Sequence, residues 1–97
     1  MIYIFEYDVL PGMQKEFFEF MKAEGGKFWT QFDFVKNYTI YSKLGGSPIF
    51  EGHVELDSFE QFQIIRNHPD WGKVSEKTSK YVLNSKRHFI LPELVID

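Results

Sequence analysis

Cysteine is absent from this chain of 97 residues, so disulfide bonds, thiolate catalysis and cysteine-ligated metal sites are excluded. Basic residues are too few for a nucleic-acid-binding surface, because 11 Lys and Arg against 14 Asp and Glu leave a net charge of −3. No apolar run approaches the roughly 20 residues of a membrane-spanning helix. We therefore expect neither nucleic acid nor a membrane among the partners of this protein.

A secretory signal is also missing, because the first residues alternate like a strand and lack a charged segment followed by an apolar one. We therefore expect a cytoplasmic protein. Repeats, linkers and low-complexity tracts are absent as well, and 97 residues is the length of one small domain. We expect residues 1–97 to form a single domain.

Aromatic residues, in contrast, are abundant: 11 Phe, 5 Tyr and 2 Trp make up 19% of the chain. Aromatic side chains bury large areas, so a small core built from them can be dense. A chain of this size has little room to cover all of them, and an apolar surface that stays exposed requires a partner. The composition is therefore a first indication of a dimer.

The first third of the chain predicts a strand followed by a helix. Alternating β-branched and aromatic residues predict a strand over residues 2–9. Apolar residues spaced three and four apart predict a helix over residues 12–24, and Gly25-Gly26 is typical of a helix end. Residues 27–33 fit either a short helical turn or an aromatic loop.

Three further strands are predicted from composition. Residues 34–42 and 49–56 are expected to pair as a hairpin, because the Gly45-Gly46 turn separates them. Residues 85–91 are expected to form the last strand, and residues 92–97 an extended tail.

Two helices are predicted between the hairpin and the last strand. Ser58 precedes an apolar helical pattern, and Gln61 three residues later completes the spacing of a capping box. Pro69 ends this helix, because proline disfavours helical geometry in the residue before it. A second helix is expected from Asp70, as its cap, to Val82.

The order of these elements is β-α-β-β-α-β, which predicts an α+β protein of ferredoxin-like fold. In this arrangement four strands form one antiparallel sheet and the helices cover one face. The other face is then uncovered, and closing it against a second copy produces a dimeric α+β barrel with an isologous interface. We therefore expect a homodimer.

The chain resembles the dimeric α+β barrel superfamily, in the broad group of small antibiotic-biosynthesis-monooxygenase-like domains. The resemblance covers essentially the whole chain. It rests on the length, the order of elements, the Pro11-Gly12 helix start and the segment Asp-Ser-Phe-Glu-Gln-Phe (57–62) followed by His68-Pro69. It implies the barrel fold, a homodimer and a C-terminal tail that reaches the partner chain.

The superfamily that the chain resembles is chemically mixed. It includes cofactor-independent monooxygenases, heme-degrading enzymes, lactone isomerases and domains without an assigned activity. Monooxygenase and heme-degrading members typically use an asparagine on the first strand with a tryptophan and a histidine. Here the first strand carries Tyr7 and Asp8 but no asparagine, and His68 and Trp71 lack the heme-degrading spacing. The resemblance therefore implies fold and dimer far more specifically than a reaction.

The first candidate site is a polar strand face on which Glu51, His53 and Glu55 alternate. A histidine among carboxylates can transfer protons or hold a metal ion. The alternative is an ion-paired barrel interior in which Lys36 or Arg87 neutralises the carboxylates. A shift of one residue in strand pairing would move this face from the barrel interior to water, so the sequence leaves its direction open.

The second candidate site combines Tyr7, His68 and Trp71. A helix that breaks above an apolar sheet leaves room for a flat ligand, and aromatic residues with polar tips suit such a pocket. The alternative is that His68 caps a helix end and Trp71 packs in the core. No glycine-rich phosphate loop or metal-ligand spacing is present, so we expect no cofactor and no metal.

Two functions are compatible with these patterns. The first is a small-molecule-binding barrel, acting as a monooxygenase or isomerase on a flat hydrophobic compound, with His53 or His68 as the catalytic base and Tyr7 and Trp71 holding the ligand. The second is a non-catalytic binding or assembly module whose core is filled by aromatic residues. An open or a filled pocket discriminates between them.

Overall fold

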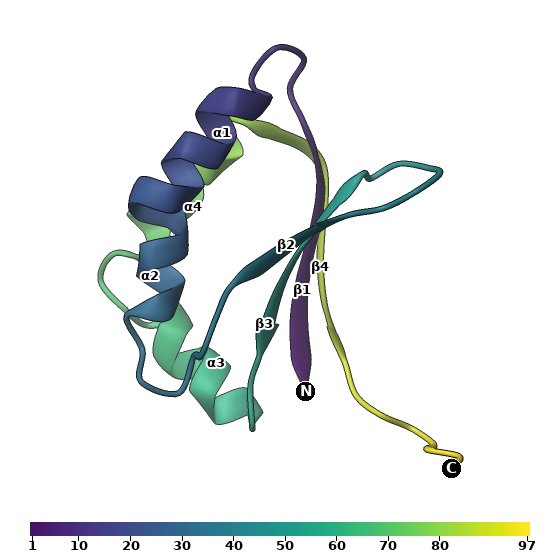
Figure 1. Ribbon diagram of the computed structural model, residues 1–97. Coiled ribbons are helices and arrows are strands. Elements are labelled where there is room, and N and C mark those ends of the chain that lie inside the picture. The colour runs from purple at the N-terminus through teal and green to yellow at the C-terminus, as the bar shows by residue number, and fades with distance from the viewer.

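A four-stranded antiparallel sheet forms one layer of the molecule, and helices cover one face of it (Figure 1). The computed structural model describes all residues from 1 to 97. The antiparallel sheet and the order of its helices and strands confirm the predicted α+β, ferredoxin-like β-α-β-β-α-β arrangement. The elements are β1 (Ile2–Val9), α1 (Gln14–Phe20), the π-helical turn η1 (Met21–Gly25), α2 (Gly26–Thr30), β2 (Thr39–Ser42), β3 (Phe50–Glu55), α3 (Phe59–Arg66), α4 (Trp71–Ser79) and β4 (Val82–Ile90).

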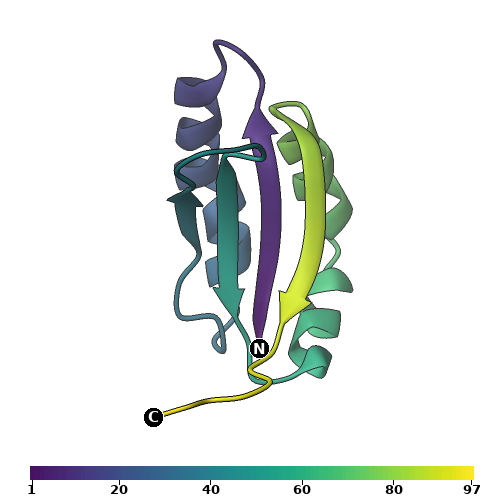
Figure 2. The same ribbon diagram turned by 90° about the vertical axis from the view of Figure 1, so that its right-hand side faces the viewer.

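The strand order is β2-β3-β1-β4, so β1 and β3 are central while β2 and β4 are the edges (Figure 2). Helices α1 and α2 lie behind the β2 side of the sheet, and α3 and α4 lie behind the β4 side. In the pairing of β1 with β3, Tyr3 is opposite Val54 and Tyr7 is opposite Phe50. Because side chains alternate along a strand, these residues share the face that the helices cover.

The prediction that Gly25-Gly26 ends the first helix is wrong. The helix continues through η1 and α2 to Thr30, with both glycines in right-handed helical geometry. A side chain at Gly25 would come within 2.5 Å of the Met21 sulfur, so this glycine serves close packing rather than termination. The continuation also places Phe28 in the core as part of a helix.

The predicted second strand is shorter than expected, because β2 begins only at Thr39. Residues 34–38 leave the sheet and pass toward the helices, where Val35 is buried in the main core. A turn in which the Val35 amide donates to the Phe32 carbonyl directs this segment inward. Burial of Val35 therefore replaces strand pairing here.

The start of α3 is as predicted, with a variation. The Ser58 hydroxyl accepts the Gln61 amide at 3.4 Å, while the Gln61 side chain accepts the amide of Asp57 at 2.8 Å. Asp70 occupies the N-cap position of α4 as predicted, but its side chain makes no capping hydrogen bond. This helix also ends at Ser79, and the residues before 82 turn the chain into β4.

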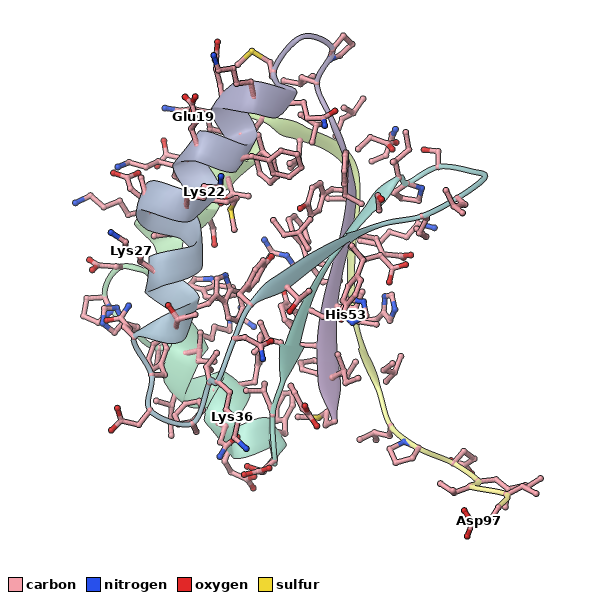
Figure 3. All side chains as sticks on the ribbon, in the orientation of Figure 1. Glu19, Lys22, Lys27, Lys36, His53 and Asp97 are labelled. Atoms are coloured by element: carbon pink, nitrogen blue, oxygen red, sulfur yellow. The ribbon has the colours of Figure 1, made fainter.

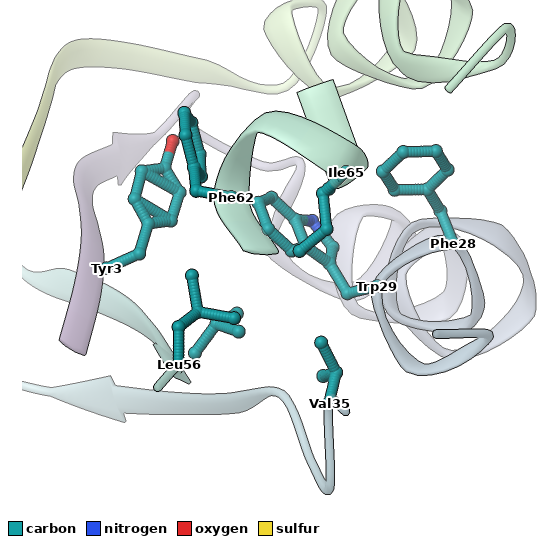
Figure 4. Packing of buried hydrophobic residues seen from close by; sticks show 8 residues of the cluster. Tyr3, Phe28, Trp29, Val35, Leu56, Phe62 and Ile65 are labelled. Carbon is teal, nitrogen blue, oxygen red and sulfur yellow. The ribbon is translucent and has the colours of Figure 1, made fainter. Parts of the chain in front are cut away.

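The core between sheet and helices consists of two apolar clusters. The larger one joins β1, β3, α2 and α3 (Figure 4) and contains Tyr3, Phe28, Trp29, Val35, Val54, Leu56, Phe62 and Ile65. The smaller one joins β1 with α1 and η1 and contains Phe5, Tyr7, Phe17 and Met21. The opposite sheet face carries no helix.

Candidate functional site

The largest hollow of the protein is a groove of about 740 Å³ between the edge strand β2 and the helical segment α1–η1. We call it the β2–α1 groove. Its apolar surface comes from both layers, and Gln14, Lys22 and Ser42 supply polar groups around it. The lining residues are Gln14, Phe18, Met21, Lys22, Gly26, Tyr38, Ile40, Ser42 and Phe50.

A much smaller central cavity lies deeper, between β1 and the helices. Its volume is about 30 Å³, which is room for about one water molecule. Tyr7 and Trp71 both line it, so the structure brings together these two of the predicted site residues. Met21 and Tyr38 line both the central cavity and the β2–α1 groove, and so they separate the two spaces.

Tyr7 is completely buried, with 0% of its surface exposed. Its ring packs against Phe5, Phe17 and Phe50 at centroid distances of 5.0, 5.3 and 6.0 Å. The buried hydroxyl has no hydrogen-bond partner. Burial raises the pKa of Tyr7, so the phenol is neutral across the physiological range.

Tyr38 was not among the residues predicted from the sequence. Its ring lies over Gly52, where an added Cβ would overlap the Tyr38 hydroxyl, and it packs against Trp29 at 5.6 Å. Burial raises the pKa of Tyr38 as well, so it is also a neutral hydroxyl. A glycine inside a strand often marks the close approach of another group. Gly52 was therefore the residue in the sequence from which a side chain packed against β3 could have been predicted.

Trp71 begins α4 and packs against Trp29 and Phe62 at 5.7 and 5.9 Å. The guanidinium carbon of Arg87 lies 5.6 Å from the centre of the Trp71 ring and 5.0 Å from that of Phe5. These distances are those of cation–π contacts. Trp71 therefore has a packing role and also faces a cation.

His68 lies apart from Tyr7 and has a structural environment. Its Nδ1 atom accepts the amide of Asp70 at 3.0 Å, and its ring packs edge-on against Phe28 and Phe32. This is the helix-end role that the sequence offered as the alternative. The imidazole lines neither the β2–α1 groove nor the central cavity.

His53 lies on the sheet face away from the helices (Figure 3). Its Nε2 atom is 2.9 Å from Glu51, and its ring packs on Tyr41 at 4.7 Å. The sheet therefore separates His53 from Tyr7 and Trp71. His53 therefore cannot exchange a proton directly with a ligand that contacts Tyr7 and Trp71.

The face that carries His53 is ion-paired, but not through the bases that the sequence suggested. Lys43 lies 2.7 Å from Glu6 and 3.5 Å from Glu51, whereas Lys36 and Arg87 take no part. The hydrogen bond from Lys43 lowers the pKa of Glu6 and raises that of Lys43. Within this face Lys43 forms ion pairs with two carboxylates, and its single positive charge offsets one of their two negative charges.

No group of three or more His, Asp or Glu side chains has the arrangement of a metal site. None of the helices has both the length and the apolar character needed to cross a bilayer. The β2–α1 groove offers aromatic and aliphatic contacts, the neutral hydroxyl of Tyr38 and the polar groups of Gln14, Lys22 and Ser42.

Comparisons with known proteins identify the fold. No protein-family model and no curated protein sequence matches the chain. An uncharacterized NIPSNAP domain protein from Burkholderia xenovorans is 16% identical, with a TM-score of 0.71 over 99% of this chain and 98% of that one.

Two other solved structures are similar. One is a dimeric ferredoxin-like protein of unknown function from Thermobifida fusca, at 18% identity and a TM-score of 0.69 over 93% of this chain and 89% of the other. The second is a dimeric protein of unknown function with a ferredoxin-like fold from Bacteroides fragilis, at 9% identity and a TM-score of 0.61 over 90% of both chains. These likenesses support the ferredoxin-like fold and do not extend to the antibiotic-biosynthesis-monooxygenase-like group.

Proposed function

We propose that this protein is a homodimer in which each subunit binds one flat, largely apolar small molecule in the β2–α1 groove. The observation that carries the proposal is the groove itself. Its volume of about 740 Å³ lies within the range of small-molecule sites, and its surface is mostly apolar with a few polar groups. Phe18 and Phe50, whose rings meet edge to face at 5.6 Å, provide a surface for a flat ring.

The predicted ligand-binding residues Tyr7 and Trp71 lie behind the inner end of the groove. Tyr38 and Met21 separate the groove from the central cavity, where the Tyr7 hydroxyl has no partner. An unpaired buried hydroxyl is costly, and a polar group that entered the central cavity would relieve that cost. Tyr7 and Trp71 therefore do not touch a ligand held in the groove, and their ligand-binding role stays a prediction for the central cavity.

The homodimer is supported by the apolar surface that the isolated chain leaves exposed. The C-terminal tail extends away from the sheet (Figure 2), and its apolar side chains are exposed, Leu94 by 76% and Ile96 by 83%. Tyr41, on the open sheet face beside His53, is 51% exposed. A second copy that covers this face would bury both the tail and Tyr41, as in the dimeric barrel that the resemblance implies.

We propose binding rather than turnover. Monooxygenase or isomerase chemistry of the kind that the resemblance implies needs a base beside the bound ring. His53 lies on the other face of the sheet and His68 caps a helix end, so neither imidazole reaches the groove. A catalytic role for either histidine would require a ligand bound elsewhere.

A neutral fluorescent probe tests the binding proposal. N-phenyl-1-naphthylamine should gain fluorescence with the wild-type protein. Most of that gain should be lost with Ser42→Trp, because Ser42 lines the groove and a tryptophan side chain there fills it. Lys15→Trp adds the same ring on α1 outside the groove and should bind as wild type does. Equal binding by all three proteins would overturn the proposal.

The second candidate function is a non-catalytic assembly module, as the sequence analysis allowed. The filled space around Tyr7 and Trp71 favours it, because only about 30 Å³ remains there. An assembly module would form the dimer yet bind no neutral flat probe in the groove, so the same titration discriminates between the two functions.

A further inference from the structure

Another hollow, of about 270 Å³, is lined by residues of β1, α3, α4 and β4. We call it the β4 hollow. Figure 2 shows β4 at the edge of the sheet opposite β2, with α3 and α4 behind it. Tyr3, Phe62, Trp71 and Phe89 give it an aromatic floor, and Arg66 and Arg87 line it from α3 and β4. Helix α4 has no buried residue and β4 is exposed along most of its length, so this edge is open to solvent.

The charged side chains that line the β4 hollow are all positive. No acidic residue lines it, and none of the five ion pairs of the structure includes an arginine. The imidazole of His88 does not contribute, because residue 88 alternates with Arg87 and its Nδ1 atom lies 3.9 Å from Glu6 on the open face. Two unpaired guanidinium groups therefore converge above four aromatic rings.

Arg87 contacts two aromatic rings, of which Trp71 belongs to the floor of the β4 hollow and Phe5 does not. Its guanidinium carbon lies 5.0 Å from the Phe5 ring centre and 5.6 Å from that of Trp71. An arginine that stacks on aromatic rings can still donate hydrogen bonds to an acceptor from the N–H groups at its edge. Burial raises the pKa of Tyr3, and the positive charge of Arg87 partly opposes that rise, which is consistent with a phenol hydroxyl close to the cation.

We propose that the β4 hollow binds a flat aromatic carboxylate. The ring of the ligand lies against Phe62, Trp71 and Phe89, and its carboxylate accepts hydrogen bonds from the guanidinium of Arg87. The planar fork of N–H donors on arginine matches the two oxygens of a carboxylate. Arg66 adds a second positive charge, and the Tyr3 hydroxyl is a further donor. This site is independent of the β2–α1 groove, which lies at the other edge of the sheet.

The test uses 2-naphthoate and its neutral analogue 2-naphthamide, titrated by calorimetry and by quenching of tryptophan fluorescence. Wild-type protein should bind the carboxylate at least tenfold more tightly than the amide, since hydrogen bonds to charged groups are the stronger class. Arg87→Gln should lower carboxylate affinity about tenfold or more and leave amide affinity unchanged.

Lys86→Gln is the matched control, because it removes the same charge from the neighbouring residue of β4, whose side chain points to the other face. It should bind both compounds as wild type does. Ser42→Trp should also keep carboxylate binding, which separates this site from the β2–α1 groove. Equal affinities of wild type for the two compounds, or equal losses in Arg87→Gln and Lys86→Gln, would overturn the proposal. Circular dichroism spectra and melting temperatures of each variant show that its fold is intact.

Discussion

Gly52 lies in the middle of β3, beneath the ring of Tyr38. A methyl group there would overlap the hydroxyl and ring of Tyr38, which is held in turn by Trp29. The space above Gly52 therefore holds Tyr38 in its position between the central cavity and the β2–α1 groove. A glycine ordinarily weakens a strand, and here it leaves room for the Tyr38 side chain.

We expect Gly52→Ala to lower the free energy of unfolding by about 1–3 kcal/mol, because the added methyl group overpacks a filled site. Urea denaturation followed by fluorescence measures the change. Gly72→Ala is the control, since nothing lies within 4 Å of an added Cβ at this helical position and alanine is the better helix former. Two variants of equal stability would contradict the packing described for Tyr38.

Tyr7→Phe should raise the free energy of unfolding by about 1 kcal/mol, because it removes a buried hydroxyl that has no hydrogen-bond partner. The aromatic packing against Phe5, Phe17 and Phe50 is kept. Urea unfolding again provides the measurement. A loss of stability would mean that the hydroxyl is satisfied in solution, by water in the central cavity or by another group.

At the scale of elements, Asp8 links the end of β1 to the β2–β3 connection and to β4. Its carboxylate, at the end of β1, accepts hydrogen bonds from the Ser47 hydroxyl, from the backbone amide of Ile49 at 2.8 Å and from the side-chain amide of Asn84 at 3.0 Å. Ser47 and Ile49 belong to the β2–β3 connection, and Asn84 belongs to β4. These bonds lower the pKa of Asp8.

A lowered pKa in the folded state means that Asp8 contributes stability above its unfolded pKa of about 3.9, and that this contribution is lost as pH falls through the folded value. We therefore expect wild type to lose more stability than Asp8→Asn between pH 6 and pH 3. Unfolding by urea at a series of pH values checks this. Asp33→Asn replaces an exposed loop aspartate and should follow wild type; an Asp8→Asn profile parallel to both would contradict the role of the carboxylate.

The sequence correctly predicted those helices and strands whose position depends on neighbouring residues in the chain. The spacing of Ser58 and Gln61 predicted the start of α3, and alternation predicted β1. Gly25 misled the prediction, because its packing against Met21 is a tertiary contact that no local pattern contains. Residues 34–38 have strand composition, but burial of Val35 against the helices decides their path.

At the scale of the whole molecule, the sequence predicted the layers but not the assignment of the polar residues to faces. Tyr7 and Trp71 both line the central cavity, whereas His68, which the sequence grouped with them, does not, and the ligand-binding role of the pair stays a prediction. His53 could not be placed, because a shift of one residue in strand pairing exchanges the faces. The β2–α1 groove and the β4 hollow were not foreseen, since each combines residues from separate helices and strands.

The proposed homodimer leads to an expectation about the tail. Deletion of residues 91–97 removes the exposed Leu91, Leu94, Val95 and Ile96 and should weaken self-association at least tenfold, because apolar burial drives association. Sedimentation velocity should show twice the chain mass of 11.6 kDa for wild type and a larger share of monomer for the deletion. A monomeric wild type at high concentration would contradict the homodimer.

Methionine methyl NMR tests whether the β2–α1 groove binds a flat apolar compound. The chain has three methionines, of which Met21 lines the groove whereas Met1 and Met13 do not. On titration of protein labelled with ¹³C at the methionine methyl groups, N-phenyl-1-naphthylamine should shift the Met21 signal and leave the other two in place. An unchanged Met21 signal at saturating probe, or equal shifts of all three, would contradict binding in the groove.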